Sequence, residues 1–593
     1  MPEILNKQTR NTFLIILILV LPVYLKFIYF NSVLTCDVQR VLESVIRFHI
    51  YTLASSFIIQ LPIIWFRSFK LRLVWIILFD VIILSVIWYY RNYYTIMSFS
   101  AIYQFNNLNG LGPSILSSIR IQDCIVVLLS ITQLVALARF KSLVQTHFKQ
   151  IKKVFVYTFS ILLLLIVVDN SRYYLRYKSL SGKYEMFFYD QCTGCKNFGL
   201  VTCWNWQFIS VLEFRKTDSE KSELQIQNWL KNHRENNKLY FLDGNSEKNI
   251  LFILVESLEG WVINTTVNGK EITPNLNKII RSEQVIYTPY VKPRTRDGRS
   301  SDAQFTINTG ILPLNVGAVC YLFPHNRFYS LADALNTKKG YSCESFIGDE
   351  ASFWNQSLMT ETLGFDRLHS SIDFDMSDKV GMGLSDDSFF QQLPNKLRNL
   401  QQPFYAQCIT LSSHLPFEMP RHKVSIQLPD TLPEVFVKYA ESIHYADFSI
   451  GILLDSLNAM GLLDNTILLI SGDHEALTID QRLKIRKHPY SKQIVPEGFF
   501  VPLIISNADT SKYVTDTITQ ADIYPTMMSV MGLNDYNWMG VGTSMFNVQV
   551  DSNGLIIEDI VDTKDSTYIY NNLQADKVSD YLIRTNYFER WSE

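Results

Sequence analysis

The run Asn249-Ile-Leu-Phe-Ile-Leu-Val-Glu256 decides the fold of the C-terminal half of this chain. Six consecutive apolar residues followed at once by an acid are typical of a strand that is covered on both faces of a parallel sheet. Similar apolar runs occur at 404–410, 466–470 and 501–505, and a helical pattern at Val435–Met460 lies between two of them. Strands that alternate with helices predict an α/β domain with a central, mainly parallel sheet and helices on both faces.

Acidic and imidazole side chains follow two of these strands. Glu256 ends the first run, and Asp473 and His474 follow the run at 466–470, directly after Gly472. In α/β sheets ligands bind beyond the carboxyl ends of the strands, and adjacent carboxylate and imidazole groups suit a divalent ion such as Zn²⁺ or Mn²⁺. This pattern favours a metal site at Asp473 and His474 over a chance surface pair. For Glu256 alone, a solvated loop acid is an equally good interpretation.

The segment Gly298-Arg-Ser-Ser-Asp-Ala-Gln-Phe305 supplies a hydroxyl. Ser301 and Gln304 have the capping-box spacing, which predicts that a helix starts there. Ser300 would then lie just ahead of the helix, where free amide groups favour an anion. A hydroxyl that binds a metal ion can lose its proton near neutral pH and attack phosphorus. The alternative interpretation, common for an isolated motif, is a plain N-cap serine.

His414 follows the run at 404–410, within Ser413-His-Leu-Pro-Phe417. An imidazole at that place could donate to a phosphate oxygen or protonate a leaving group, although a single loop histidine is more often inert. Together, an acid, a hydroxyl, an Asp-His pair and a further histidine all follow strands of one domain. This set of side chains predicts a metal-assisted phosphoryl transfer.

The first 170 residues have a different character. Through Asn170 the chain has 15 Lys and Arg against 6 Asp and Glu, whereas the rest is net acidic, which argues against nucleic acid as a partner. Five apolar stretches lie at 12–30, 49–66, 73–90, 121–138 and 154–168. Each approaches the roughly 20 residues that cross a bilayer, and no small-residue cleavage site of a signal peptide follows the first. We therefore predict a five-helix transmembrane domain over residues 1–170.

Basic loops predict the orientation of these spans. The segments 67–72 and 139–153 carry Lys and Arg without any acid, whereas the loop at 37–43 has no basic excess. Because cytoplasmic loops are enriched in Lys and Arg, we expect a multi-pass protein of the cell membrane with a cytoplasmic N-terminus and an extracytoplasmic catalytic domain. Asp80 and Asp123 in or near spans are functional candidates by default, but a position at a helix end or facing the bundle is the favoured interpretation.

Beyond the membrane domain we expect three parts, a connector at 171–245, a catalytic domain at 246–550 and a C-terminal extension at 551–593. Cys192, Cys195 and Cys203 lie in the connector. A single Cys-x-x-Cys is a weak signal for a redox or metal site. On the oxidising side of a membrane, a local disulfide is the expected state.

Several motifs of the second half, together with the five spans, match one enzyme family. They are Phe252–Ser257, Val267–Asn277, Ser300–Phe305, Phe353–Asn355, Gly383–Asp386, His414–Phe417, Asp464–Thr466, Gly472–His474 and Gln520–Thr526. From about Asn249 to Asn534 the chain resembles the lipoteichoic-acid-synthase-like phosphoglycerol transferases of the alkaline phosphatase/sulfatase superfamily. The resemblance implies that the α/β domain has an alkaline-phosphatase/sulfatase-like fold.

The resemblance also implies a set of metal ligands. One divalent ion would be held by Glu256, Asp473, His474 and the oxygen of Ser300; Mn²⁺ is expected, with Zn²⁺ or Mg²⁺ as alternatives. Ser300 stands where most members of the family have Thr and would be the nucleophile. Ser301 is the less favoured alternative.

Substrate contacts are implied as well. His414 would contact the phosphate, and Trp354 and Gln356 would line the substrate pocket. Two positions depart from the family: Ile347, before Gly348, replaces a His, and Gln356 replaces an Arg, which removes a charged, bidentate phosphate partner. Three arginines ahead of the nucleophile either compensate for this loss or form a solvated loop: Arg294, Arg296 and Arg299.

The function that the resemblance implies is the transfer of a phosphate-linked headgroup, of the phosphoglycerol kind, from a membrane phospholipid to an envelope glycan or glycolipid through a covalent Ser300 intermediate. A phosphoethanolamine transferase and a phosphatase or sulfatase-type hydrolase are alternatives within the superfamily. Sulfate ester hydrolysis is disfavoured because Ser300-Ser-Asp-Ala lacks the Pro and Arg of the formylglycine motif. A non-catalytic lipid- or glycan-binding membrane sensor is the alternative from another class, and it has no need of the whole catalytic set.

Overall fold

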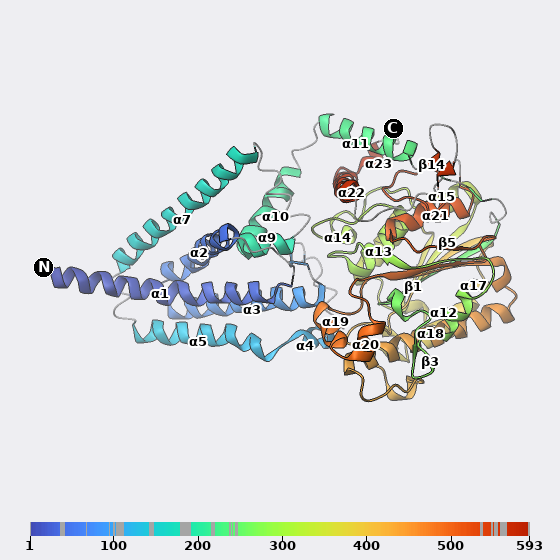
Figure 1. Cartoon of the computed structure of the whole chain (residues 1–593), viewed down its shortest axis with the longest axis horizontal. Helices are drawn as coiled ribbons and strands as arrows, with labels where there is room; N and C mark the ends of the chain where they lie inside the picture. The colour runs from blue at the N-terminus through green and yellow to red at the C-terminus, as the bar shows by residue number, and fades with distance from the viewer. Residues whose placement is uncertain are drawn as a thin grey trace. The chain divides into compact units, whose positions relative to one another are not determined.

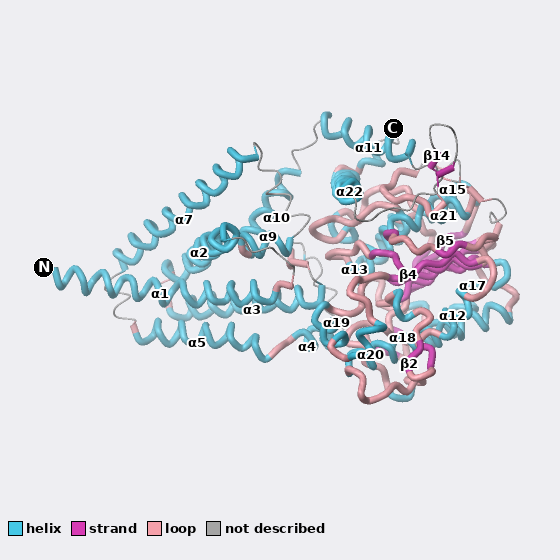
Figure 2. Tube along the Cα trace, viewed as in Figure 1, coloured by secondary structure: helices cyan, strands magenta, loops and turns pink. Residues whose placement is uncertain are grey.

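The structure is a computed structural model (Figures 1 and 2). It describes residues 2–35, 42–66, 68–93, 95–98, 101, 112–140, 148–177, 191–214, 220–236, 239, 241–242, 247–533, 536, 538–546, 549–550, 556–557 and 566–590. The chain forms two compact units, which divide at Lys216 and Thr217, inside the segment that the sequence suggests as a connector.

The first unit contains five helices that are long and apolar enough to cross a membrane, as the sequence predicts. They are α1 (Pro2–Val33), α2 (Leu42–Trp65), α3 (Phe69–Tyr93), α5 (Cys124–Arg139) and α7 (Phe148–Tyr177). The fifth helix is longer than its apolar run, because it continues through Asp169 to Tyr177. The chain is therefore a multi-pass membrane protein. Parts of the loops used to predict its orientation, including Asp37, Arg40 and Lys141, lie outside the described residues.

Both acids of the predicted spans face the interior of the helix bundle. Asp80 accepts a hydrogen bond of 2.5 Å from Nζ of Lys26, which also donates to Ser130. Asp123 accepts two hydrogen bonds, of 2.7 and 2.8 Å, from the guanidinium of Arg91. Since a buried charge is tolerated only when it is paired and hydrogen-bonded, these contacts confirm the bundle-facing interpretation of the two acids.

The expected local disulfide is wrong. Cys192 in α9 (Gln191–Phe198) is disulfide-bonded, but Cys195 in the same helix and Cys203 in α10 (Leu200–Phe214) are free. Both free thiols are fully buried in an apolar cluster with Phe198 and Leu200. They therefore act as small hydrophobic side chains, which is the usual role of a buried free cysteine.

The second unit is built on a mixed sheet with the strand order β12-β4-β11-β10-β1-β9-β5-β6, and β13 also pairs with β4. The strands are β1 (Asn249–Val255), β4 (Val285–Lys292), β5 (Ser342–Ile347), β6 (Arg367–His369), β9 (Phe404–Ile409), β10 (Thr466–Gly472), β11 (Val501–Ser506), β12 (Lys512–Tyr513) and β13 (Ile518–Thr519). The run from β10 to β6 is parallel, and β11 is antiparallel to both of its neighbours. The sheet is mainly parallel, as predicted.

Register places the ends of the three central strands together. Val255 of β1 pairs with Gly472 of β10, and Leu254 pairs with Ile409 of β9. The residues that follow these strands must therefore leave the sheet at one edge. Three segments that are far apart in the sequence meet there.

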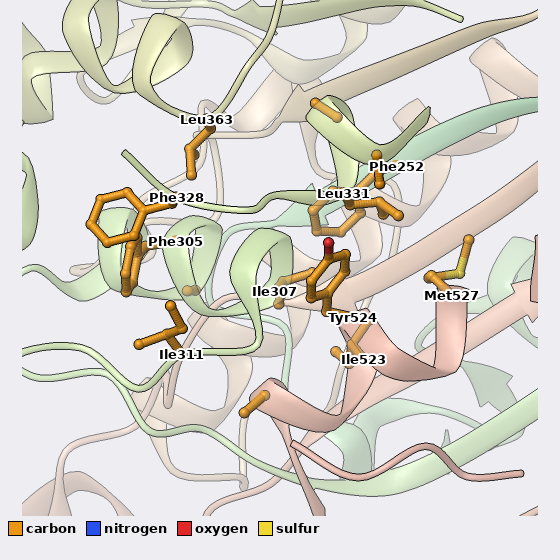
Figure 3. Packing of buried hydrophobic residues seen from close by; sticks show 14 of the residues in the cluster. Phe252, Phe305, Ile307, Ile311, Phe328, Leu331, Leu363, Ile523, Tyr524 and Met527 are labelled. Atoms are coloured by element: carbon orange, nitrogen blue, oxygen red, sulfur yellow. The ribbon is translucent and has the colours of Figure 1, made fainter. Parts of the chain in front are cut away.

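Successive residues of β1 enter two different cores, because side chains of a strand alternate between faces. Phe252 belongs to the core under α13 (Arg299–Thr309), α15 (Leu331–Lys339) and α21 (Ile523–Val530). Figure 3 shows part of this core, with Phe305, Ile307, Leu331, Ile523, Tyr524 and Met527. Ile253 belongs to the core under α12 (Pro274–Ile280), α17 (Asp386–Arg398) and α18 (Glu434–Ala459). Helices thus cover both faces, as the unbroken apolar runs predict.

The C-terminal helices α22 (Ser566–Arg584) and α23 (Tyr587–Arg590) are part of the second unit. Val578, Leu582 and Phe588 are almost fully buried in the same core as Phe252. A further hydrogen bond joins the backbone N–H of Leu312 to the hydroxyl of Ser579. The described part of the C-terminal extension is therefore packed against the α/β domain.

Candidate active site

Three predicted metal ligands meet at the edge of the sheet. Glu256 follows β1, and Asp473 and His474 follow β10; one ligand atom from each lies within 4.8 Å of the others. Nε2 of His474 is 3.6 Å from Oε1 of Glu256 and 3.4 Å from Oδ2 of Asp473. All three side chains are buried. The register of β1 and β10 produces this cluster, because both strands end at the same level.

The donor atoms of this cluster fit a divalent cation. Nδ1 of His474 donates to the backbone carbonyl of Glu475 at 3.0 Å, so that Nε2 carries the lone pair. Oδ2 of Asp473 is buried and accepts no hydrogen bond from the described residues. Burial, followed by the charge of Asp473, raises the pKa of Glu256 well above its usual value. Two buried carboxylates beside a neutral imidazole are stabilised when a cation binds between them.

Gly472 allows the close approach of strands that the cluster requires. A Cβ atom at this position would lie 2.1 Å from the backbone carbonyl oxygen of Leu258, a distance that no substitution can relieve without moving the backbone. The backbone N–H of Asp473 donates to the carbonyl of Val255. The glycine therefore keeps the turns after β1 and β10 in contact, as its position in the sequence suggests.

Ser300 lies beside the cluster, but the helix starts earlier than the capping-box spacing predicts. Helix α13 begins at Arg299 with Gly298 as its N-cap, so Ser300 is in the first turn and not ahead of it. Its Oγ is 3.4 Å from Oε2 of Glu256. Ser301 is not the N-cap residue; its Oγ donates to the carbonyl of Gly298 at 2.8 Å and contacts the thiol of Cys320.

Asp302, in the first turn of α13, bonds to the segment that precedes the helix. Its Oδ2 accepts hydrogen bonds from the backbone N–H groups of Arg296 and Gly298 at 2.8 and 3.0 Å. A carboxylate from the first turn thus folds back and holds the loop that leads into the helix. Burial raises the pKa of Asp302 to about 7. The spacing argument therefore placed the N-cap three residues too late, at Ser301 instead of Gly298, and no side chain caps the helix.

The three arginines ahead of Ser300 are not a solvated loop. Arg294 and Arg296 contact Asp576 of α22, at 2.8 and 3.4 Å. Arg299 donates to Oε1 of Glu475 at 2.6 Å and is almost fully buried. Burial alone would raise the pKa of Glu475, but Arg299 holds it below its usual value. All three guanidinium groups therefore contact acids of the same unit.

His414 lies near the cluster and is half-buried. Nδ1 donates to the carbonyl of Leu415 at 2.7 Å, which leaves Nε2 without a proton in the neutral ring. Burial lowers the pKa of His414 to about 4, and the neighbouring charges of His474 and Arg299 add to this effect. The preceding hydroxyl of Ser413 donates to the carbonyl of Glu256 at 2.6 Å. The loop after β9 is thereby joined to the loop after β1.

The predicted pocket residues Trp354 and Gln356 are buried. Trp354 and Asn355 have left-handed backbone conformations, with φ of 50° and 52°, directly before α16 (Gln356–Thr362). The Asn355 side chain donates to the carbonyl of Cys320, whose thiol contacts Ser301. The loop of Trp354 thus reaches the start of α13 through a single intervening residue.

Ile347 is the last residue of β5 and is buried in the core. It brings a purely apolar side chain to the position where the family has His. The next residue, Gly348, accepts a backbone hydrogen bond of 2.8 Å from Leu384. Neither residue places a polar side chain at the site.

Sequence reasoning missed several residues that contact the site. Ser257, Glu259 and Gln520 are fully buried polar residues. The Gln520 side chain donates to the carbonyl of Asp473 at 2.6 Å and accepts from the backbone N–H of Arg294 at 3.2 Å. It therefore connects the metal-ligand loop to the segment before Ser300. Only its place in the Gln520–Thr526 motif pointed to it.

Two family models match the chain, in the order that the two units predict. The lipoteichoic acid synthase N-terminal domain matches residues 1–201, and the sulfatase domain matches residues 248–533. The second match contains every candidate site residue. Both halves of the chain are thus assigned independently.

Two curated relatives support the same assignment. Lipoteichoic acid synthase 1 of Bacillus subtilis is 30% identical over 334 residues, which is 55% of this chain and 52% of the relative. Lipoteichoic acid synthase of Staphylococcus aureus is 28% identical over 380 residues, 61% of this chain and 57% of the relative. The chain thus spans little more than half the length of these relatives. Among solved structures, lipoteichoic acid synthase LtaP from Listeria monocytogenes has 22% identity and a TM-score of 0.49, over 60% of this chain and 98% of that one.

Proposed function

We propose that this chain is a phosphotransferase, because it belongs to the lipoteichoic-acid-synthase-like family of the alkaline phosphatase/sulfatase superfamily. It joins a lipoteichoic acid synthase N-terminal domain to a sulfatase domain. It moves a phosphate-linked headgroup, of the phosphoglycerol kind, from a membrane phospholipid to an envelope glycan or glycolipid. The curated relatives are named as lipoteichoic acid synthases, which favours this donor and acceptor class over a hydrolase. A divalent metal ion, Mn²⁺ in the first place, is the cofactor.

One observation carries the proposal. Glu256, Asp473 and His474 meet within 4.8 Å, and the hydroxyl of Ser300 is 3.4 Å from the first of them. A membrane sensor that only bound lipid would have no need of a buried cluster of charged groups, which is costly to keep without a cation. The cluster with an adjacent hydroxyl is suited to phosphoryl transfer.

The metal ion would be held by Glu256, Asp473, His474 and the oxygen of Ser300. When bound, it supplies positive charge that lowers the pKa of a coordinated hydroxyl and neutralises charge at the phosphate. Ser301 does not compete with Ser300, because its hydroxyl donates to the carbonyl of Gly298. The nucleophile is therefore Ser300.

The Ser300 hydroxyl gives up its proton to solvent, its oxygen attacks the donor phosphorus, and the bond from phosphorus to the diacylglycerol oxygen breaks. The headgroup phosphate is then attached to Ser300, and an acceptor hydroxyl displaces it from the serine. The two half-reactions share one site and one nucleophile.

His414 contacts the phosphate in this proposal. In the free protein it is neutral at pH 7, since its pKa is lowered to about 4. An anionic phosphate bound close to Nε2 raises that pKa, because an opposite charge favours the imidazolium. His414 thus gains its proton with the substrate and returns it to the departing alkoxide.

Trp354 and Gln356 line the headgroup pocket, with an amide in place of the family's arginine. The phospholipid donor suits a domain that is tethered to a membrane by five spans. We place the N-terminus in the cytoplasm and the catalytic domain outside it, where the envelope acceptor lies. In this proposal the domains are residues 1–170, 171–245, 246–550 and 551–593.

The test is to trap the covalent intermediate. Purified full-length protein with Mn²⁺ is incubated with headgroup-labelled phosphatidylglycerol or phosphatidylethanolamine, and the peptide that contains Ser300 is analysed by mass spectrometry. We expect phosphoglycerol on Ser300. Phosphoethanolamine on Ser300 would keep the mechanism but replace the donor. Label on another residue, or headgroup release without any modified serine, would contradict the covalent mechanism.

A further inference from the structure

Ser257 hydrogen-bonds to both carboxylates of the candidate metal site. Its hydroxyl donates to Oε1 of Glu256 at 2.7 Å, and its backbone N–H donates to Oδ1 of Asp473 at 2.8 Å. The two bonds fix the mutual position of ligands that come from different strands. Oδ1 of Asp473 also accepts from the backbone N–H of His474 at 2.7 Å. The orientation of this carboxylate is therefore set before any cation binds.

Ser257 holds this position in an unfavourable backbone conformation. Its φ is 57°, in the left-handed region that residues other than glycine seldom adopt. Such a conformation persists only where surrounding contacts enforce it. One contact to the Ser257 backbone comes from a helix outside the metal-ligand loops.

That contact is the hydroxyl of Tyr439, on α18. It donates to the backbone carbonyl of Ser257 at 2.9 Å and accepts from the backbone N–H of Glu259 at 3.0 Å. One hydroxyl thereby closes the turn after β1. The tyrosine is fully buried, and its ring packs against Phe417 and Trp261, with centroids 5.1 and 5.6 Å away.

Glu259 extends the same network to the turn after β10. Its Oε1 accepts from the backbone N–H groups of Ala476 and Leu477 at 3.1 and 3.2 Å. Both of its oxygens accept from Arg482, at 2.6 and 2.7 Å. Trp261 donates to Oε2 as well, at 2.5 Å. The fully buried carboxylate of Glu259 therefore joins the turn after β1 to the turn after β10, and both turns carry candidate metal ligands.

We propose that Tyr439 is a positioning residue for the metal site, which acts through Ser257 on the carboxylates of Glu256 and Asp473. Tyr439 hydrogen-bonds to no metal ligand itself. Its hydroxyl fixes the turn that points the Ser257 donors at both ligands. Residues that orient metal ligands from behind typically contribute about 10- to 100-fold to metal affinity. This inference rests on the metal site of the proposed function and adds a residue that no motif of the sequence singled out.

The same helix offers a matched control. Tyr445 is also buried on α18, and its hydroxyl accepts from the backbone N–H of Asp387 at 3.2 Å and donates to its Oδ1 at 2.6 Å. Tyr445→Phe therefore removes the same atom from an equivalent arrangement that does not reach the metal ligands. Both variants leave buried partners without a hydrogen bond, so their effects on stability should be similar.

The experiment measures Mn²⁺ binding to metal-free full-length protein by calorimetry, with the thermal midpoint of each metal-free variant recorded alongside. We expect Tyr439→Phe to weaken Mn²⁺ binding by about tenfold or more, while Tyr445→Phe binds as the wild type does. Ser257→Ala, which removes the hydroxyl that contacts Glu256, should weaken binding too. This second variant keeps the test decisive if Tyr439→Phe does not fold.

Two results would overturn the inference. Either Tyr439→Phe and Ser257→Ala bind Mn²⁺ as tightly as the wild type does, or Tyr445→Phe loses as much affinity as Tyr439→Phe. A wild-type protein that binds no Mn²⁺ would contradict the metal site itself. The failure of the positioning role and the failure of the proposed function are thus separate outcomes.

Discussion

The carboxylate of Asp576, near the C-terminus, accepts two hydrogen bonds from the guanidinium of Arg294, at 2.8 and 2.9 Å. Arg294 lies six residues before Ser300 in the sequence. The contact fastens the segment that leads into the nucleophile helix to α22. The described C-terminal helices are thus part of the support of the active site.

Asp576→Asn should lower both stability and activity. Removing one partner of a largely buried ion pair leaves the other charge uncompensated, which costs about 3 kcal/mol or less at this partial exposure. We expect a lower thermal midpoint and slower headgroup release. Asp580→Asn is the control, because Asp580 pairs with Arg584 inside the same helix. If both variants lost stability but kept full activity, Asp576 would have only a structural role.

Ser300→Ala should abolish headgroup release from labelled phospholipid, because no other described hydroxyl approaches Glu256 from the nucleophile helix. Ser301→Ala should retain most of it, since that hydroxyl is bonded to the Gly298 carbonyl. The release of labelled headgroup from mixed vesicles measures both rates. The reverse pattern would move the nucleophile to Ser301.

Chelation of divalent ions should lower the thermal midpoint of the wild type, and Mn²⁺ should restore it. A ligand present at a thousand times its Kd stabilises the folded state by about 4 kcal/mol. In Asp473→Ala neither treatment should change the midpoint, because the cluster loses a buried carboxylate. Differential scanning fluorimetry in detergent provides the comparison. An equal response of wild type and variant would place the ion elsewhere.

The pH dependence of stability should include a contribution from Asp447, far from the metal ligands in the sequence. This buried carboxyl on α18 accepts from the backbone N–H groups of Asn275 and Leu276. Burial raises its pKa from 3.8 to about 6, although these hydrogen bonds oppose the shift. The folded protein therefore keeps a proton that the unfolded chain releases. The contribution of Asp447 to the stability of the folded state is therefore fully present below pH 3.8 and is lost as the pH rises through about 6.

Comparison of the wild type with Asp447→Asn isolates this contribution, since the amide cannot titrate. As the pH rises from about 4 to about 7, the thermal midpoint of the wild type should fall relative to that of Asp447→Asn. The change corresponds to at most roughly 3 kcal/mol in the free energy of unfolding. Thermal unfolding over this pH range provides the measurement. A constant difference would show that Asp447 does not titrate in this range.

Much of the architecture can be predicted from short-range patterns in the sequence. Unbroken apolar runs predicted the parallel strands, because these strands are buried on both faces of the sheet. The length of the runs distinguished the strands from the five spans, because a helix that crosses a bilayer needs a longer apolar stretch. The rule that ligands bind after strand ends favoured Asp473 and His474 and left Glu256 open, and the structure brings all three together. The helix of Ser300 was predicted from its capping-box spacing, which placed the N-cap three residues too late.

The sequence by itself therefore determined the kind of fold and which side chains are candidates for the chemistry. Only the tertiary structure decided how they are held. The hydrogen bonds of Ser257 with Glu256 and Asp473, of Tyr439 with Ser257, and of Arg294 with Asp576 join segments that no local pattern connects. A buried polar group must find a partner somewhere in the folded chain. Which partner it finds depends on packing and strand register, and these exist only once the whole domain has folded.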